Sequence, residues 1–155
     1  MPRLVTALLA VALLGAGGHP PWLRPPAGWV LVENPPNYGT LKILAMWKEA
    51  KEEDGPQNIS LGVQPYAGRL ASYVAATKRM LYAGTQPTLY SEKPFACASG
   101  PARLLVYESS AFGTAAHFEQ LLVQRTTDVY VATYTRRMTQ PQDAAAASAL
   151  RSICR

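Results

Sequence analysis

The sequence predicts an α+β fold, in which an antiparallel sheet carries two main helices. The apolar spacing of a helix occurs twice, over residues 68–82 and 141–154, and four strand-like segments with short connections lie between these stretches. Strands that follow one another closely pair antiparallel. Three further strand-like segments precede the first helix. The two helices could cover both faces of the sheet or lie side by side on one.

The composition is that of one folded domain. The chain has 155 residues, of which 48% are hydrophobic and 16% are charged, and this balance excludes a disordered charged tail. The net charge of +5 is spread along the chain without clusters, whereas proteins that bind nucleic acid concentrate their basic residues. We therefore expect a real core and no nucleic-acid partner.

Residues 1–18 have the pattern of a secretory signal peptide. Arg3 supplies the positive charge, Leu4–Leu14 is apolar, and Ala16-Gly17-Gly18 offers the small residues of a cleavage site. As a helix the apolar run would span about 16 Å, which is too short for a hydrocarbon core of about 30 Å. We expect an exported protein, periplasmic or extracellular, with no stable membrane anchor after cleavage.

Residues 19–27 are rich in proline, which stiffens the chain and cannot donate to a strand ladder. We expect a linker or a strap here, followed by a single domain over residues 28–155. Three strands are expected at the start of this domain, over 28–33, 41–48 and 58–63. The charged connection before the third strand includes the acids at 52–54, which lack the ligand spacing of a calcium loop.

The main helix is expected over residues 68–82. Its apolar stripe has members three and four positions apart, namely Leu70, Tyr73, Val74, Thr77 and Leu81. Gly84 stands where a glycine commonly ends a helix. One face of this helix should therefore lie against the sheet.

After this helix the pattern changes to the period of two that is typical of strands. We expect strands over 88–98 and 102–107, followed by a hairpin over 118–134 that turns at Arg125–Asp128. The second arm, residues 129–135, is rich in β-branched and aromatic residues. We expect this hairpin to close the sheet and to deliver the last helix across it.

The last helix is expected over residues 141–154. Thr139 and Gln142 have the spacing of a capping box, and Pro141 suits the first helical turn. The stripe that would face the sheet consists of Ala146, Leu150 and Ile153.

Two cysteines occur, Cys97 in a predicted strand and Cys154 at the end of the last helix. In an oxidising compartment an even number of cysteines indicates a disulfide. A bond between them would stabilise the fold by about 4 kcal/mol through loop closure. Two buried free thiols are the alternative, and no Cys-x-x-Cys redox motif exists.

Few residues have the pattern of a catalytic or metal site. His117 and Glu119 share one face of a strand, but a third ligand is not evident, and we predict no metal and no cofactor. Residue order does not exclude a Ser/His/Asp triad, although the Gly-x-Ser-x-Gly motif is absent. The catalytic alternative is therefore a secreted hydrolase whose site is built from scattered polar residues, including His117.

Candidate contact residues gather on the second arm of the hairpin and just beyond it. Tyrosine is frequent at interfaces, and Tyr130 and Tyr134 lie on this arm. Arg136 and Arg137 follow, and with Arg103 and Arg125 they could form a modest basic patch around the ends of the hairpin. Tyr130, Tyr134, Arg136 and Arg137 are the predicted ligand or partner contacts.

Several stretches together resemble the PsbP-like superfamily, which includes the DcrB-type bacterial envelope proteins. They are GWVLVEN at 28–34, NISLGV at 58–63, DVYVATYT at 128–135 and AAAASALRSIC at 144–154. The resemblance covers about residues 27–155 and lies in the order of elements, because no catalytic or ligand-binding motif matches. It implies an α-β-α sandwich around an antiparallel sheet, and an accessory, assembly or binding role outside the cytosol.

These observations lead us to expect an exported, non-enzymatic binding or assembly factor of the cell envelope. Its partner would be another envelope protein or a small ligand, held at the sheet rim or in a groove between helix and sheet. The secreted hydrolase remains the alternative.

Overall fold

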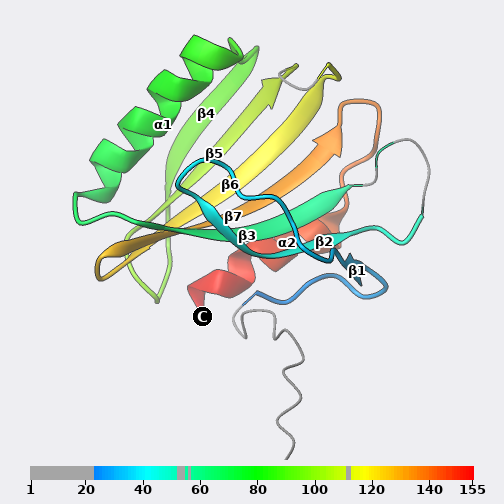
Figure 1. The fold of residues 1–155 in the computed structure, drawn as a ribbon, viewed down its shortest axis with the longest axis horizontal. Coiled ribbons are helices and arrows are strands. Elements are labelled where there is room, and N and C mark those ends of the chain that lie inside the picture. Colours follow the sequence, from blue (N-terminus) through cyan, green and yellow to red (C-terminus); the bar gives the residue numbers. More distant parts are fainter. Residues whose placement is uncertain (1–22, 52–54, 56, 111–112) are drawn as a thin grey trace, which may run out of the picture.

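The computed structural model of the chain describes residues 23–51, 55, 57–110 and 113–155. Within these residues seven strands form one antiparallel sheet in the order β1-β2-β3-β7-β6-β5-β4 (Figure 1). The strands are β1 (Val30–Leu31), β2 (Lys42–Lys48), β3 (Asn58–Pro65), β4 (Leu89–Phe95), β5 (Ala102–Ser109), β6 (Ala116–Arg125) and β7 (Asp128–Arg137). The helices are α1 (Leu70–Gly84) and α2 (Ala144–Leu150), and α2 continues into the 3-10 turn η1 (Arg151–Cys154). The predicted signal peptide lies outside the described residues.

The hairpin of β6 and β7 lies at the centre of the sheet. It pairs from Arg125↔Asp128 to Ala116↔Arg137, and β7 then pairs with β3 while β6 pairs with β5. The expectation that this hairpin closes the sheet was wrong. Both of its faces are apolar near the turn, so both faces need cover. The centre of the sheet provides this cover, because one helix packs on each face there.

The two helices cover opposite faces of this sheet. Leu121 of β6 packs in the core beneath α2, whereas the next residue, Leu122, packs beneath α1. Successive residues of a strand point to opposite faces, so this alternation places one helix on each side. Figure 1 shows α2 partly hidden behind the strands.

The α1 face has a compact core at one end. Leu70, Tyr73 and Val74 of α1 are buried, and they pack against residues of β5, β6 and β7, namely Leu105, Leu122, Val129 and Val131. The rest of the predicted stripe, Thr77 and Leu81, is only partly buried. Contact with the sheet is therefore closest in the first turns of α1.

Gly84 does not terminate α1 in the expected way. It is the last residue of the helix, Thr85 is the C-cap, and the left-handed residue is Gln86, with φ of 44°. The Thr85 amide donates to the Leu81 carbonyl at 2.8 Å and its hydroxyl donates to the same oxygen at 3.0 Å. These bonds satisfy a carbonyl group that the end of a helix otherwise leaves without a partner.

The last helix is shorter than predicted and has a different cap. Asp143 is the N-cap, and its Oδ1 accepts hydrogen bonds from the amides of Ala145 at 2.7 Å and Ala146 at 3.1 Å. The capping box expected at Thr139, with Pro141 in the first turn, is therefore not the start of this helix. The predicted stripe is correct, because Ala146, Leu150 and Ile153 are buried against the sheet.

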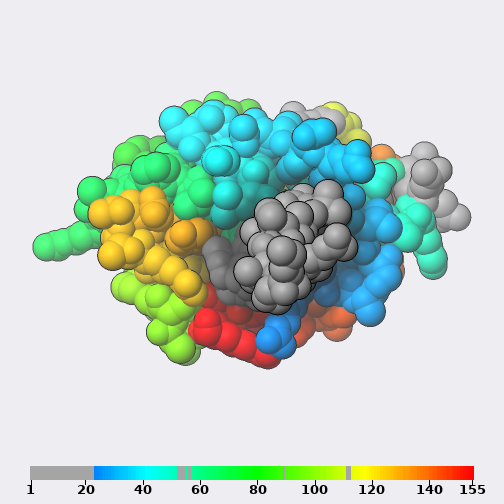
Figure 2. Space-filling view, turned by 60° about the horizontal axis from the view of Figure 1, so that its bottom comes forward, coloured from blue at the N-terminus to red at the C-terminus, as the bar shows by residue number. Residues whose placement is uncertain are grey.

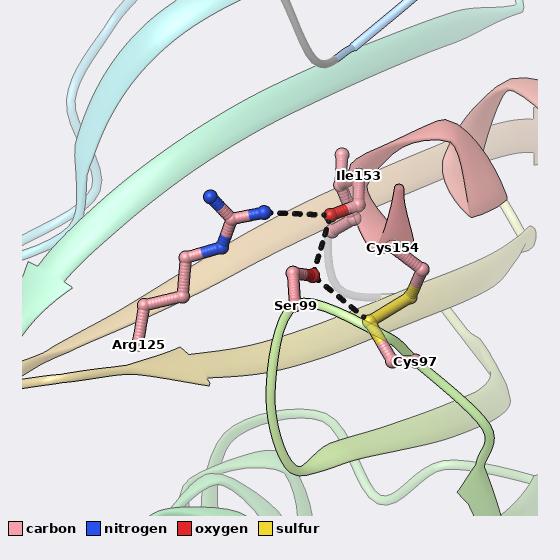
Figure 3. Close-up of a disulfide and its surroundings, with 5 residues drawn as sticks. All are labelled: Cys97, Ser99, Arg125, Ile153 and Cys154. Atoms are coloured by element: carbon pink, nitrogen blue, oxygen red, sulfur yellow. Dashed lines mark hydrogen bonds between the residues drawn. A yellow bond between two sulfur atoms is a disulfide. The ribbon is translucent and has the colours of Figure 1, made fainter.

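A disulfide joins η1 to the turn after β4, and we call this joined region the C-terminal clasp. Cys97 is bonded to Cys154, and it lies in the turn after β4 rather than in a strand as expected. The Ile153 carbonyl accepts hydrogen bonds from the Ser99 hydroxyl at 2.9 Å and from Arg125 Nη2 at 3.1 Å (Figure 3). The C-terminus is therefore held to both the β4–β5 turn and β6.

The segment before β1 lies against this clasp. Leu23 is completely buried in the core beneath α2, and the Arg24 amide donates to Ser152 Oγ at 2.9 Å. Figure 2 shows the C-terminal segment in red between the N-terminal segment in blue and the light green turn after β4. Residues 23–27 thus act as a strap over the domain.

Candidate functional site: the open half of the α1 face

Helix α1 covers only part of its face of the sheet. Leu122 and Val131 lie beneath its first turns. Farther along the same face, β6 continues with Gln120 and Phe118, and β7 continues with Thr133, and these side chains line a hollow instead. Beyond its first turns α1 runs along the β4 edge, where Lys78 and Tyr82 lie against Tyr90 (Figure 1). The part of the face over the other strands, which we call the open half, is therefore not covered by a helix.

The floor of this open half consists of two rows of residues that pair across the strands. The outer row is Tyr107, Phe118, Thr135 and Asn58. The inner row is Gln120, Thr133, Ser60 and Met46. Paired residues share one face of a sheet, so the register alone brings these eight side chains together.

Two adjoining hollows lie on this floor, with volumes of about 380 Å³ and about 220 Å³. Both are lined by the same five residues, Tyr38, Met46, Asn58, Phe118 and Thr135. We call the two hollows together the groove. Its size falls within the range of small-molecule sites, which begins at roughly 300 Å³.

The segment before β2 forms one side of the groove and passes in front of the strands in Figure 1. Tyr38 and Leu41 exchange backbone hydrogen bonds of 3.1 Å and 3.0 Å, and Asn37 Oδ1 accepts from the Ile43 amide at 2.9 Å. Leu41 lies directly over Gly62, where a Cβ atom would come within 2.9 Å of its side chain. The missing side chain at Gly62 therefore lets this segment pack close to the sheet.

The inner part of the groove is aromatic and uncharged. The rings of Tyr107 and Phe118 are stacked, with centroids 4.9 Å apart and planes inclined by 13°. Burial, and then the proximity of Tyr90, raises the pKa of the Tyr107 hydroxyl, so this group is neutral. Beside the rings, Gln120 Nε2 donates to Thr133 Oγ1 at 3.3 Å. This part of the groove can take up an apolar group and offer a few hydrogen bonds.

The outer end of the groove is basic. Arg136 and Arg137 line the larger hollow, and no acidic side chain among the described residues lines either hollow. Gln140 holds this end together, because its Oε1 accepts from the Arg137 amide at 2.8 Å and its Nε2 donates to the Gly55 carbonyl at 3.1 Å. The Arg137 guanidinium lies against Gly55, where a Cβ atom would come within 2.5 Å of Nη2.

The four predicted contact residues divide between the two faces of the sheet. Arg136 and Arg137 both border the larger hollow, but they are successive residues of β7. Alternation therefore places the Arg137 side chain on the groove face and the Arg136 side chain on the α2 face, beside its pair His117. Tyr134 is completely buried on the α2 face, where its hydroxyl donates to Gln57 Oε1 and accepts from the Asp143 amide at 2.9 Å. Tyr130 lies on that face too, with Arg125 5.9 Å from the centre of its ring. Tyr134 is therefore a core residue and not a contact residue.

His117 lies on the α2 face, opposite the groove. Its Nδ1 is 3.4 Å from Glu108 Oε1 and its Nε2 is 3.7 Å from Glu119 Oε1. Glu119 Oε1 also accepts from Gln142 Nε2 at 2.6 Å. In the described part of the chain, no three His, Cys, Asp or Glu side chains are arranged to hold a metal ion.

Sequence reasoning missed the floor of the groove. Alternation along β6 and β7 does place Phe118 and Gln120 on one face and Thr133 and Thr135 on one face. Nothing local distinguishes an open part of a face from a covered part, because that depends on where α1 ends its contact with the sheet.

No helix of the described residues is both long and apolar enough to span a bilayer.

No family model and no curated protein matches the sequence. Two of the similar solved structures are described here. A putative regulator of unknown function from Pseudomonas aeruginosa is 19% identical, with a TM-score of 0.48 over 71% of this chain and 83% of that one. LpqN, involved in cell envelope biogenesis of Mycobacterium tuberculosis, is 16% identical, with a TM-score of 0.46 over 73% and 67%. Similarity at this level concerns the path of the chain and carries no argument about function.

Proposed function

We propose that this protein is an exported, non-enzymatic binding or assembly factor of the cell envelope, and that it holds its ligand in the groove. The observation that carries the proposal is the open half of the α1 face, where two hollows adjoin over a floor of aromatic, hydroxyl and amide side chains. Concave sites of this mixed character are typical of ligand binding. A floor built on paired strands also holds its side chains in fixed positions.

Export is supported by two independent features. The first 18 residues have the pattern of a signal peptide. The bond between Cys97 and Cys154 is of the kind that persists in oxidising compartments such as the periplasm or the extracellular space. The partner is another envelope protein or a small ligand, and the volume of the groove favours a small ligand or a single protruding side chain.

We also propose that the fold is of the PsbP-like type. The order of three strands, one helix, four strands and a final helix supports this, as do the helices on opposite faces of the sheet. An experimental structure would test it, because a PsbP-like fold must superpose on members of that superfamily more closely than on other antiparallel sandwiches.

A variant that fills the groove tests the binding proposal. Thr135 lines both hollows, so Thr135→Trp should block the groove. Thr127→Trp is the matched control, because Thr127 is exposed in the β6–β7 turn at the other end of the sheet. After incubation with envelope extract, native mass spectrometry should find the same added mass on the wild type and the control, and none on Thr135→Trp. Equal retention by all three proteins would contradict the proposal.

The hydrolase alternative has one observation in its favour, which is the placement of His117 between two carboxylates. A panel of ester, amide and glycoside substrates would test it. Hydrolysis that His117→Ala abolishes, while Thr135→Trp leaves it unchanged, would overturn the non-enzymatic proposal and move the site to the α2 face.

A further inference from the structure

We propose that the ligand of the groove is a small amphipathic oxyanion. Its carboxylate, sulfonate or phosphate group would lie at Arg137, and its apolar body would lie against Phe118 and the stacked ring of Tyr107. This inference rests on the proposed function, and it adds the chemical class and the orientation of the ligand.

The first step is the distribution of charge. Both arginines border the larger hollow, Arg137 with its side chain on the groove face, and none of the described lining residues is acidic. Glu108 of β5 and Glu119 of β6 lie on the α2 face with His117. The groove is therefore positive at one end, and such a site concentrates anions.

The second step distinguishes the two arginines. Arg136 Nη1 donates to the Gln140 carbonyl at 2.9 Å, so this side chain helps to hold the turn that follows β7. The Arg137 guanidinium forms no ion pair with the described residues, and it is positioned by its neighbour Gly55 and by the bond from its own amide to Gln140. A planar guanidinium binds an oxyanion through two parallel hydrogen bonds. Arg137 is thus the binding group and Arg136 is a positioning residue.

The third step concerns the apolar part of the ligand. Phe118 and Arg137 line the same hollow, and Tyr107 stacks on the Phe118 ring from the adjoining one. Tyr38 and Met46 line both hollows and add apolar contact. A hollow of about 380 Å³ accommodates a ligand of two or three rings, or a short chain, with its charged group at the arginine end.

Two probes of the same shape separate charge from apolar contact. Anilinonaphthalene sulfonate carries a sulfonate, and phenylnaphthylamine has the same rings without it, and both fluoresce when bound in an apolar site. We expect the sulfonate to bind the wild type about tenfold more tightly than the amine, as one charge-assisted contact predicts. Higher salt should narrow this difference.

Variants then assign the effect to Arg137. Arg137→Gln should weaken sulfonate binding about tenfold and leave amine binding unchanged, which also shows that the variant is folded. Arg79→Gln is the matched control, because it removes the same charge from an exposed position on α1 and should change neither affinity. Thr135→Trp should abolish binding of both probes.

The outcomes separate this inference from the proposed function. If neither probe binds, or if Thr135→Trp still binds both, the groove is not a ligand site and the proposed function fails. If both probes bind equally tightly and Arg137→Gln changes neither affinity, the groove remains a ligand site but the oxyanion inference is overturned. Glu52, Glu53 and Asp54 lie outside the described residues. Sulfonate binding that appears only after all three are neutralised would also overturn the inference.

Discussion

At the scale of the residue, Tyr134 shows how one buried hydroxyl can link distant segments. It donates to Gln57 from the connection before β3 and accepts from the amide of Asp143 at the start of α2. Gln57 Nε2 in turn donates to the Pro141 carbonyl at 3.2 Å. Buried polar groups need such partners, so these bonds determine how the segment between β7 and α2 crosses the sheet.

Removing this hydroxyl should destabilise the fold without changing its shape. Tyr134→Phe leaves the Asp143 amide and the Gln57 side chain without a buried partner, so we expect a loss of about 1–3 kcal/mol in the free energy of unfolding. Urea denaturation of the variant measures it. Tyr82→Phe is the control, since Tyr82 is 47% exposed and its change should be near zero. Equal stability of the two variants would contradict this role for Tyr134.

Buried tyrosines also predict a loss of stability at alkaline pH. Burial is the main cause that raises the pKa of Tyr73, Tyr107 and Tyr134 above 10.0, and burial followed by the charge of Glu92 raises that of Tyr90 to about 12. Above pH 10.0 the unfolded chain therefore loses protons that the folded protein keeps. Stability should be full below pH 10.0 and should fall as the pH rises through the folded pKa values.

Two measurements check this dependence. The urea midpoint should fall only above the ordinary tyrosine pKa of 10.0. The absorbance of tyrosinate in the folded protein should lag behind that of the urea-unfolded chain. Coincident titration curves for the two states would contradict the prediction.

At the scale of the element, the start of α2 shows how two caps compete. Thr139 and Asp143 both precede the helix pattern, and the structure uses Asp143, whose carboxylate binds two amides. A carboxylate at this position also meets the positive end of the helix dipole. The segment before it is held by the Tyr134 hydroxyl, which removes residues 139–142 from the helix.

Mutation of the two candidate caps distinguishes them. Asp143→Ala should lower the free energy of unfolding by about 1 kcal/mol, because two amides lose their acceptor. Thr139→Ala is the matched comparison and should cost almost nothing, since Thr139 is exposed in a turn. Thermal or urea unfolding of both variants measures the difference. A larger loss of stability for Thr139→Ala than for Asp143→Ala would support the capping box predicted from the sequence instead.

The disulfide that holds η1 to the turn after β4 leads to a further prediction about stability. Replacing Cys97 and Cys154 by serine should lower the free energy of unfolding by about 4 kcal/mol, because the disulfide closes a separation of 57 residues in the unfolded chain. Reductant should destabilise the wild type by a similar amount and leave the double variant unchanged. If reductant affects both proteins equally, the disulfide is not the cause.

At the scale of the whole molecule, the order of the strands predicts a gradient of protection. The central strands β6 and β7 have a neighbour on each side and a helix on each face, whereas β1 and β4 are the edges. Amide hydrogen exchange should therefore be slowest in β6 and β7 and fastest in β1 and the outward-facing amides of β4. Faster exchange in β7 than in β4 would contradict the central placement of the hairpin.

Much of the fold was predictable because its signals are local. The alternation of β7 and the stripe of α2 depend on neighbouring residues, and both predictions agree with the structure. The errors arose where distant residues decide. Ile59 pairs with Tyr134, which places β3 beside β7 and moves the hairpin to the centre, and no pattern within either strand indicates that pairing.

The sequence by itself therefore determined the type and order of the elements and the two-helix α+β class, and it indicated a disulfide between the two cysteines. Only the tertiary structure decided that the helices lie on opposite faces and that α1 leaves half of its face open. It also decided that Arg137, and not Tyr134, lies at that open half. The physical reason is that periodicity is a property of neighbouring residues, whereas burial and exposure depend on what packs against a face from elsewhere in the chain.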